Sequence, residues 1–324
     1  GIAILFFKKE SDTGNGCGKT CPVLMPIDSR YKGIFYMLLA ALGFSLMGGA
    51  AKLLKGSFGA GQLVFWRNAV GLLVLIAGFM VKPPINKGGK FHLLLFRGMM
   101  GTTALYTLLY CILHIPLGTA MTYNLTSALF IAVFSFLLFR EYHGRIVLLA
   151  VLLGFLGMLL IYKPAMHLPW FYHVAGLVSG ITSALAYITV NRLAGYYDSR
   201  IIVLAFIGTG VLVPSVLMII RYLFTIPVDD VFFISWRWPV GIEWFYVLWL
   251  GLAALFGQYF VTKAYGADKA GVVSAIGYAN IIFSVFIGMA LGDAFPDWMS
   301  SLGILCIIAS GVIISLVKRK TKPA

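Results

Sequence analysis

Polar side chains interrupt several long apolar segments of this sequence, and each one is costly in a membrane unless it meets a partner. Arg67 is the sharpest case, because it lies about a turn and a half inside the apolar segment 61–81. A guanidinium group at this depth can extend to the membrane surface or face an internal cavity. In a cavity it would attract a carboxylate or another anion. The sequence alone leaves both interpretations open.

Tyrosines, amides and hydroxyls occupy similar depths in other apolar segments, where they could contact a small organic molecule. Any one of them could instead form a helix–helix hydrogen bond. Their presence at mid-depth in both halves of the chain favours a shared binding site. The predicted substrate-binding residues are Arg67, Trp66, Tyr106, Tyr123, Asn124, Ser127, Tyr187, Asn191, Gln258, Tyr259, Tyr278 and Asn280.

Residues for covalent or metal chemistry are not suitably arranged. The five histidines lie at the ends of apolar segments or in loops, and the four cysteines are too scattered for a disulfide framework. The segment Gly14–Thr20 resembles a phosphate-binding loop, but Thr13 occupies the position of its first glycine. We therefore expect no catalytic residue, no metal and no cofactor, which disfavours an intramembrane enzyme.

No acidic residue lies deep within an apolar segment. A proton relay through a carboxylate at mid-membrane is therefore not expected, and exchange or facilitated diffusion remain alternatives. Three charged residues near segment ends are predicted to act at gates or helix ends. They are Glu141, Asp293 and Lys263.

The elements that must position these residues are long apolar runs. Hydrophobic residues make up 60% of the chain and charged residues 11%, against about 25% charged residues in soluble domains. Runs of about 20 apolar residues cross a bilayer as helices. The predicted fold is an all-α polytopic membrane protein with ten transmembrane helices. These are 33–54, 61–81, 92–112, 116–139, 145–162, 174–194, 201–224, 243–264, 270–292 and 298–317.

The net charge of +14 is unevenly distributed along the chain. Most lysines and arginines fall in the two tails and in the even-numbered loops between the predicted helices. The positive-inside rule then places both termini in the cytoplasm and the protein in the cytoplasmic (inner) membrane. The basic charge is explained by this topology, so no nucleic-acid partner is expected.

An internal repeat relates the two halves of the sequence. Segments 116–141 and 268–293 align without a gap, 152 residues apart. With an odd number of helices in each half, the second half enters the membrane from the opposite side, which gives an inverted repeat around a central cavity. The predicted domains are two five-helix repeats, 30–165 and 172–320. The segment 1–29 is expected to be disordered or artefactual, with Met25 as the natural start.

Several short motifs lie on individual predicted helices, and two acidic residues end the fourth and ninth of these helices. They are Phe65-Trp66-Arg67-Asn68, Arg97-Gly98, Ile115-Pro116-Leu117-Gly118-Thr119-Ala120, Gln258-Tyr259-Phe260-Val261-Thr262-Lys263-Ala264 and the acidic residues Glu141 and Asp293. Together they resemble the drug/metabolite transporter superfamily, in its EamA-domain branch, over about 30–318. That family often has proline in the middle of the fourth and ninth helices. This chain has Ala128 and Asn280 there, so the resemblance does not carry a helix break to these points.

The resemblance implies a secondary transporter that moves a small organic metabolite by alternating access. The expected substrate is an amino acid, an amino-acid derivative or a nucleoside-like compound such as S-adenosylmethionine. The alternative is a drug or toxic-metabolite exporter of the same fold, and a membrane receptor is the other class considered. The expected partners are the substrate and the lipid bilayer. The small-residue motif 288–292 suits helix packing or a homodimer contact equally well.

Overall fold

The computed structural model describes 32–81, 83–84, 88–115, 117–127, 130–131, 134, 145–162, 169–225, 236–268, 273, 276–292 and 298–320. Ten helices occupy most of this part of the chain, and it contains no strand. They are α2 (Lys32–Leu53), α3 (Ala60–Val81), α4 (Phe91–His114), α5 (Leu117–Leu125), α7 (Arg145–Tyr162), α8 (Trp170–Leu193), α9 (Ser199–Phe224), α10 (Glu243–Ala267), α12 (Ala279–Ala290) and α13 (Trp298–Lys320). The predicted all-α class is confirmed for the described residues.

Five of the described helices are long and apolar enough to cross a membrane. They are α2, α3, α8, α9 and α10. Helix α4 has a similar length but is not among these five, and it carries Arg97, three threonines and two tyrosines. Helices α5 and α12 are short, with 9 and 12 residues. The lengths and compositions are those of a multi-pass membrane protein.

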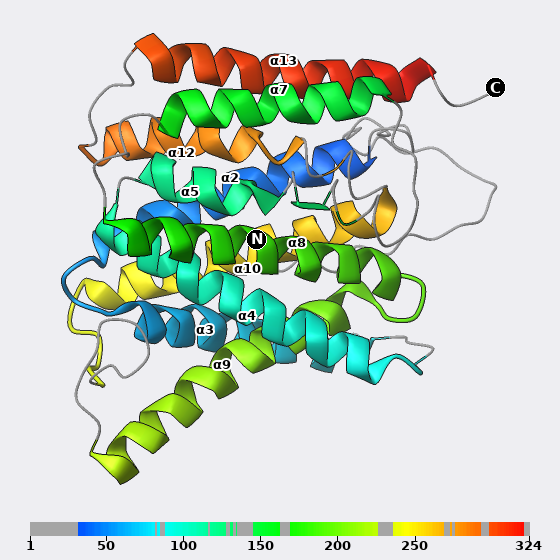
Figure 1. Cartoon of the computed structure of the whole chain (residues 1–324). Helices are drawn as coiled ribbons and strands as arrows, with labels where there is room; N and C mark the ends of the chain where they lie inside the picture. Colours follow the sequence, from blue (N-terminus) through cyan, green and yellow to red (C-terminus); the bar gives the residue numbers. More distant parts are fainter. Residues whose placement is uncertain are drawn as a thin grey trace, which may run out of the picture.

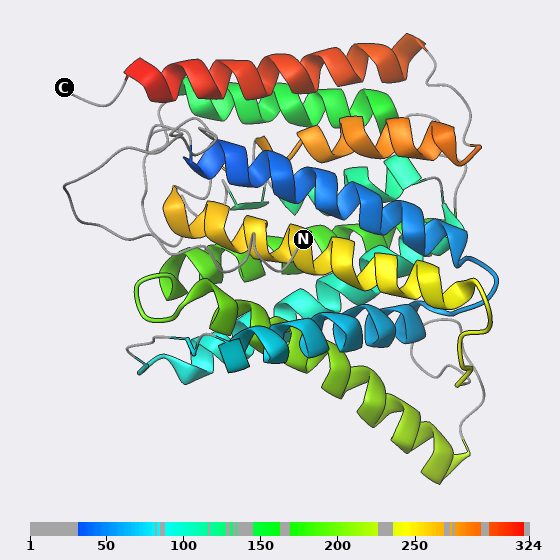
Figure 2. The same ribbon diagram turned by 180° about the vertical axis from the view of Figure 1, so that it is seen from behind.

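The helices lie side by side in a bundle, as Figure 1 shows. Helices α7 and α13 pack together at one edge, and α9 lies at the opposite edge and projects from the bundle. Figure 2 shows the same arrangement from behind. Between these edges, α2 packs along α10 and α4 packs along α8. Each of these two pairs joins a helix of the first half to a helix of the second half.

The contacts between helices repeat when the two halves of the chain are exchanged. In chain order, α2, α3, α4, α5 and α7 correspond to α8, α9, α10, α12 and α13. The α2–α10 contact then has α8–α4 as its counterpart, and α3–α10 has α9–α4. The pairs α3–α9, α5–α12 and α7–α13 join equivalent helices. This is the contact pattern expected of two related halves.

Glycines at the α3–α9 crossing also occupy matching positions when α3 is compared with α9. A side chain at Gly71 of α3 would meet Ile207 of α9, and a side chain at Gly210 of α9 would meet Asn68 of α3. Residues 207 and 210 follow 68 and 71 by the same 139 positions. Small residues at both places let the two helices approach closely.

Two interruptions of the helices lie at equivalent places in the two halves. The amide of Thr126 donates to the carbonyl of Tyr123 at 3.1 Å, and the amide of Asn280 donates to the carbonyl of Gly277 at 2.9 Å. These are i→i−3 bonds, tighter than α-helical ones. The Thr126 hydroxyl also donates to the Tyr123 carbonyl at 2.7 Å, which competes with regular helix bonding. The chain therefore turns close to both expected points without proline, although Ala128 itself lies outside the described residues.

Asp198 is the N-cap of helix α9, and its carboxylate accepts the backbone N–H of Arg200 at 2.9 Å and its guanidinium at 2.9 Å. Burial acts to raise the pKa of Asp198, but the hydrogen bonds from Arg200 outweigh it and hold the pKa below its ordinary value. The carboxylate therefore stabilises the fold at neutral pH, and this contribution is lost as the pH falls through the lowered pKa.

We expect Asp198→Ala to destabilise the protein by about 1 kcal/mol through loss of the helix cap. Asp198→Asn keeps a capping oxygen and is the matched control, which should lose only the charge contribution. Thermal unfolding in detergent at neutral and acidic pH measures both variants. An Asn variant that differs from wild type as much in acid as at neutral pH would contradict this account.

Candidate functional site

A cavity lies between the two halves of the bundle and is lined by residues from eight helices. Its volume is about 50 Å³, enough for a few water molecules. Pockets that hold small-molecule ligands are larger, about 300 Å³ or more. A metabolite would therefore require the surrounding helices to move apart. The lining residues are Phe44, Met47, Arg67, Arg97, Gly101, Ala104, Leu105, Leu108, Met121, Asn124, Ser183, Ala186, Tyr187, Phe206, Gln258 and Asn280.

Arg67 faces this cavity from α3 and is only 3% exposed. Its Nε donates to the sulfur of Met47 at 3.2 Å, and its Nη1 donates to Oδ1 of Asn68 at 2.9 Å. Asn68 is in turn held by a bond from its amide to the carbonyl of Val64 at 2.8 Å. These partners are neutral, so they orient the guanidinium without balancing its charge. The interpretation in which Arg67 reaches the membrane surface is wrong.

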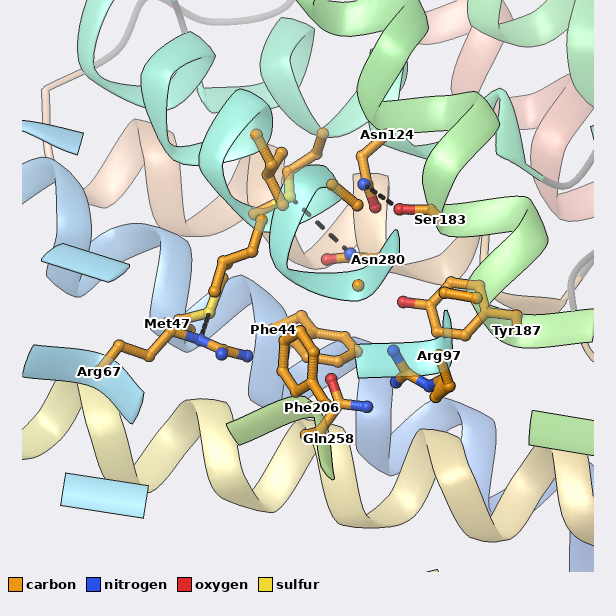
Figure 3. Close-up of a pocket in the computed structure, with 16 residues that line it drawn as sticks. Phe44, Met47, Arg67, Arg97, Asn124, Ser183, Tyr187, Phe206, Gln258 and Asn280 are labelled. Carbon is orange, nitrogen blue, oxygen red and sulfur yellow. Dashed lines mark hydrogen bonds between the residues drawn. The ribbon is translucent and has the colours of Figure 1, made fainter. Parts of the chain in front are cut away.

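Arg97 is a second buried cation in the same cavity, and it is 1% exposed. Its Nε has no hydrogen-bond partner among the described residues. The guanidinium carbon lies 4.9 Å from the centre of the Phe206 ring and 6.0 Å from that of Tyr187. The guanidinium carbon of Arg67 lies 5.2 Å from the same Phe206 ring. Figure 3 shows aromatic rings, Phe206 among them, between the two arginines.

Sequence reasoning missed Arg97 as a site residue, because an arginine near the start of a predicted helix is also typical of a basic helix end. The available signal was its place about two turns inside 91–114, which is as deep as Arg67 in its own helix. Phe44, Met47 and Phe206 were missed for another reason. Apolar residues that line a cavity look like those that face lipid.

Two amides meet the cavity from α5 and α12. The Asn124 amide nitrogen donates to the hydroxyls of Ser179 and Ser183 of α8, both at 2.9 Å. The Asn280 side-chain oxygen accepts the hydroxyl of Ser45 of α2 at 2.5 Å. The amide nitrogen of Asn280 contacts only the sulfur of Met121 among the described residues, at 3.9 Å. Each amide thus bonds a neighbouring helix through one polar atom, Nδ2 in Asn124 and Oδ1 in Asn280. The other polar atom of each amide is left for a polar ligand.

The structure brings five of the twelve predicted binding residues together at this cavity. They are Arg67, Asn124, Tyr187, Gln258 and Asn280. Tyr187 stacks on Tyr265 with ring centres 4.7 Å apart. Among the described residues, the side chain of Gln258 makes only a long bond, 3.5 Å, from its amide nitrogen to the hydroxyl of Thr262. Residues of both halves of the chain are present in this group.

Trp66 lies away from the cavity, in an aromatic cluster formed with Trp236, Trp238 and Trp244. Its ring centre is 5.4 to 5.6 Å from each of the other three. Beside this cluster, Arg237 pairs with Glu243 at 3.1 Å. The cluster therefore ties the segment before α10 to α3.

The other six predicted residues are not among those that line the cavity. Tyr106, Tyr123, Ser127, Tyr259 and Tyr278 are buried but do not line the cavity. Side chains added at Gly176 of α8 and Gly154 of α7 would meet Tyr123 and Tyr278. Asn191 donates to the backbone carbonyls of Tyr265 and Asp268, at 2.7 and 3.1 Å.

The predicted gate and helix-end residues are only partly described. Glu141 and Asp293 lie outside the described residues. The ammonium group of Lys263 in α10 lies 5.0 Å from the ring centre of Tyr259 and 5.5 Å from that of Tyr36 in α2. Among the described residues, no three His, Cys, Asp or Glu side chains lie close enough together to hold a metal ion.

Comparison with known proteins places this architecture in a family. The profile of the EamA-like transporter family matches residues 31–163. An "Uncharacterized transporter" of Helicobacter pylori (strain J99) is 32% identical over 291 residues, which cover 88% of this chain and 94% of that protein. The chain belongs to the EamA-like transporter family. The resemblance to the drug/metabolite transporter superfamily inferred from its motifs is confirmed.

Other relatives extend this comparison. The pseudopaline exporter CntI of Pseudomonas aeruginosa is 28% identical to this EamA-like transporter. The match covers 91% of the present chain and 100% of the exporter. Human solute carrier family 35 member G1 is 25% identical, over 86% of this chain and 78% of the relative. A solved crystal structure matches with a TM-score of 0.71 and 17% identity, over 90% of this chain and 99% of the other. That last likeness concerns the fold alone.

The site of this EamA-like transporter is suited to holding an anion rather than to reacting with it. Two guanidinium groups offer up to ten N–H donors, and only two of these are seen to bond other side chains in the described part of the chain. Neutral amides and a tyrosine surround them. The arrangement provides charge and hydrogen bonds for reversible binding, with no nucleophile and base in contact among the residues that line the cavity.

Proposed function

We propose that this protein is a secondary transporter that moves a small organic metabolite with an acidic group across the cytoplasmic membrane by alternating access. The observation that carries the proposal is Arg67, a buried cation without a counter-charge among the described residues, in a cavity lined by both halves of the chain. Removing such a charge from water is costly unless a ligand balances it. The small cavity corresponds to a state closed around the site.

The proposed architecture is an inverted repeat of two five-helix units, 30–165 and 172–320, with ten transmembrane helices and both termini in the cytoplasm. The exchange of helix contacts between the halves supports it, as does the matching pair of glycines at the α3–α9 crossing. In such repeats, the substrate binds at the interface of the two units near interrupted helices. The turns at Thr126 and Tyr278 fit this description.

The proposed substrate is an amino acid, an amino-acid derivative or a nucleoside-like compound such as S-adenosylmethionine. Its carboxylate would lie against Arg67, and its polar groups against Asn124, Asn280 and Gln258. The relative named as a pseudopaline exporter supports outward movement of a metabolite. Export of drugs or toxic metabolites is the second candidate, and it is favoured by the apolar lining from Phe44, Met47 and Phe206.

Counterflow in proteoliposomes tests the transport function. Purified protein is reconstituted into liposomes loaded with one unlabelled compound, and entry of the same labelled compound is followed for amino acids, their carboxylated derivatives and S-adenosylmethionine. We expect accumulation of at least one compound above that in protein-free liposomes. Chemical conversion of the label would indicate an enzyme instead, and binding without accumulation would indicate a receptor.

A further inference from the structure

The cavity contains two buried positive charges, and we infer that its substrate carries two separate acidic groups, one for Arg67 and one for Arg97. This inference rests on the proposed transport function and narrows the substrate to organic dianions, such as dicarboxylates or amino acids with a second carboxylate. Sequence reasoning pointed to only one cation and therefore to one carboxylate.

The charges of the described residues leave both arginines unbalanced. The acidic side chains in the described part of the chain are Asp198, Glu243 and Asp268. Asp198 pairs with Arg200, and Glu243 pairs with Arg237. Asp268 lies against Gly33 at the start of α2, away from the cavity. A site with two uncompensated cations attracts a ligand with two negative charges more strongly than one with a single charge.

The aromatic ring between the arginines separates the two anion sites. The guanidinium carbons lie 5.2 and 4.9 Å from the centre of the Phe206 ring. The two charges are therefore no more than about 10 Å apart, with the ring between them in Figure 3. One carboxylate beside one arginine would leave the other without an anion. Two acidic groups joined by a short apolar chain could lie across the ring and reach both.

The two arginines differ in how many donors they have available. Arg67 gives two of its donors to Met47 and Asn68, which fixes the plane of its guanidinium group. The Nε of Arg97 has no hydrogen-bond partner among the described residues, and its guanidinium group lies against Gly101 and the rings of Phe206 and Tyr187. It can offer two parallel N–H donors to a carboxylate, the geometry of the strongest charge-assisted pairs. Arg97 is thus the anchor for the second acidic group.

A matched series of acids tests this inference by binding rather than by flux. The purified protein is titrated with succinate, glutarate, adipate and pimelate, and with the monoamide of each, while its thermal unfolding in detergent is recorded. Each monoamide keeps the length of its diacid but replaces one carboxylate with a neutral group. We expect the best diacid to reach half-maximal stabilisation at a concentration at least roughly tenfold lower than its monoamide.

The same titration is repeated with Arg67→Gln and Arg97→Gln. In each variant the preference for the diacid should disappear, while Arg237→Gln should retain it because Arg237 lies outside the cavity. Equal binding of diacid and monoamide to the wild-type protein would overturn the inference. So would a preference that persists in both cavity variants, or the absence of stabilisation by any diacid. The wild-type comparison decides the matter even where a variant does not fold.

Failure of the dianion site and failure of the transport function give different experimental results. Diacid binding without counterflow would support the dianion site and reject transport. Counterflow of a neutral or singly charged compound that is unaffected by Arg97→Gln would support transport and reject the dianion site.

Discussion

Replacing Arg67 with alanine is expected to abolish flux of the transported metabolite while the protein remains folded in the membrane. The substrate carboxylate would lose its buried cationic partner, and truncation of one member of such a pair costs about 2–5 kcal/mol. That range corresponds to a loss of affinity of roughly 30-fold to several thousand-fold. Counterflow in proteoliposomes measures the flux, and the amount of monodisperse protein in detergent reports folding.

The matched control is Arg237→Ala, which removes a cation that is half exposed and lies outside the cavity. It should lose little flux, because exposed ion pairs contribute about 0–1 kcal/mol. The melting temperature of Arg67→Ala is also informative. In the empty protein Arg67 has no described counter-charge, so its removal should not lower the melting temperature as loss of a paired residue would. Normal flux through Arg67→Ala would remove this residue from the site.

Placing a leucine at Gly251 is expected to prevent stable folding. A Cβ atom at this position of α10 would overlap the side chain of Val70 on α3, and the rest of a leucine would need more room. The equivalent place in the other half is Gly98 of α4, where a Cβ atom would meet Thr209 and the backbone of Ala205 in α9. Overpacking of a tight contact costs about 1–3 kcal/mol or more. Thermal unfolding and the yield of monodisperse protein should both fall.

Gly208 of α9 provides the matched control for this change. It is also a helical glycine, but a Cβ atom there would meet nothing within 4 Å. Gly208→Leu should therefore leave the melting temperature near that of wild type. If both variants lose stability to the same extent, the effect comes from the general cost of altering a helical glycine, and the close α3–α10 contact is not its cause.

The sequence was sufficient to predict the helical class, because long apolar runs have few alternatives in a membrane. It also predicted Arg67 and four further cavity residues, since polar groups at mid-depth stand out against an apolar background. It could not say which face of each helix turns inward. The inward face depends on how the neighbouring helices pack. Trp66 belongs to the same motif as Arg67, but it packs on three other tryptophans instead of facing the cavity.

Helix interruptions were also beyond prediction, for a local reason. Proline is the usual signal for a break, and neither expected point has it. At Thr126 the hydroxyl bonds the carbonyl of Tyr123, and at Gly277 the chain has no side chain to support a regular helix. Neither residue is a clear sequence signal for a helix interruption, because threonine and glycine are common in membrane helices.

Arg67 and Phe206 occupy corresponding positions, since 206 follows 67 by the same 139 residues that relate the glycines of these helices. Gly98 of α4 packs on α9 and Gly251 of α10 packs on α3, and matching these two glycines pairs Arg97 with Leu250. Both cations thus come from the first half. The positive charge of the cavity is therefore carried by one half of the chain, while the other half contributes aromatic and amide side chains.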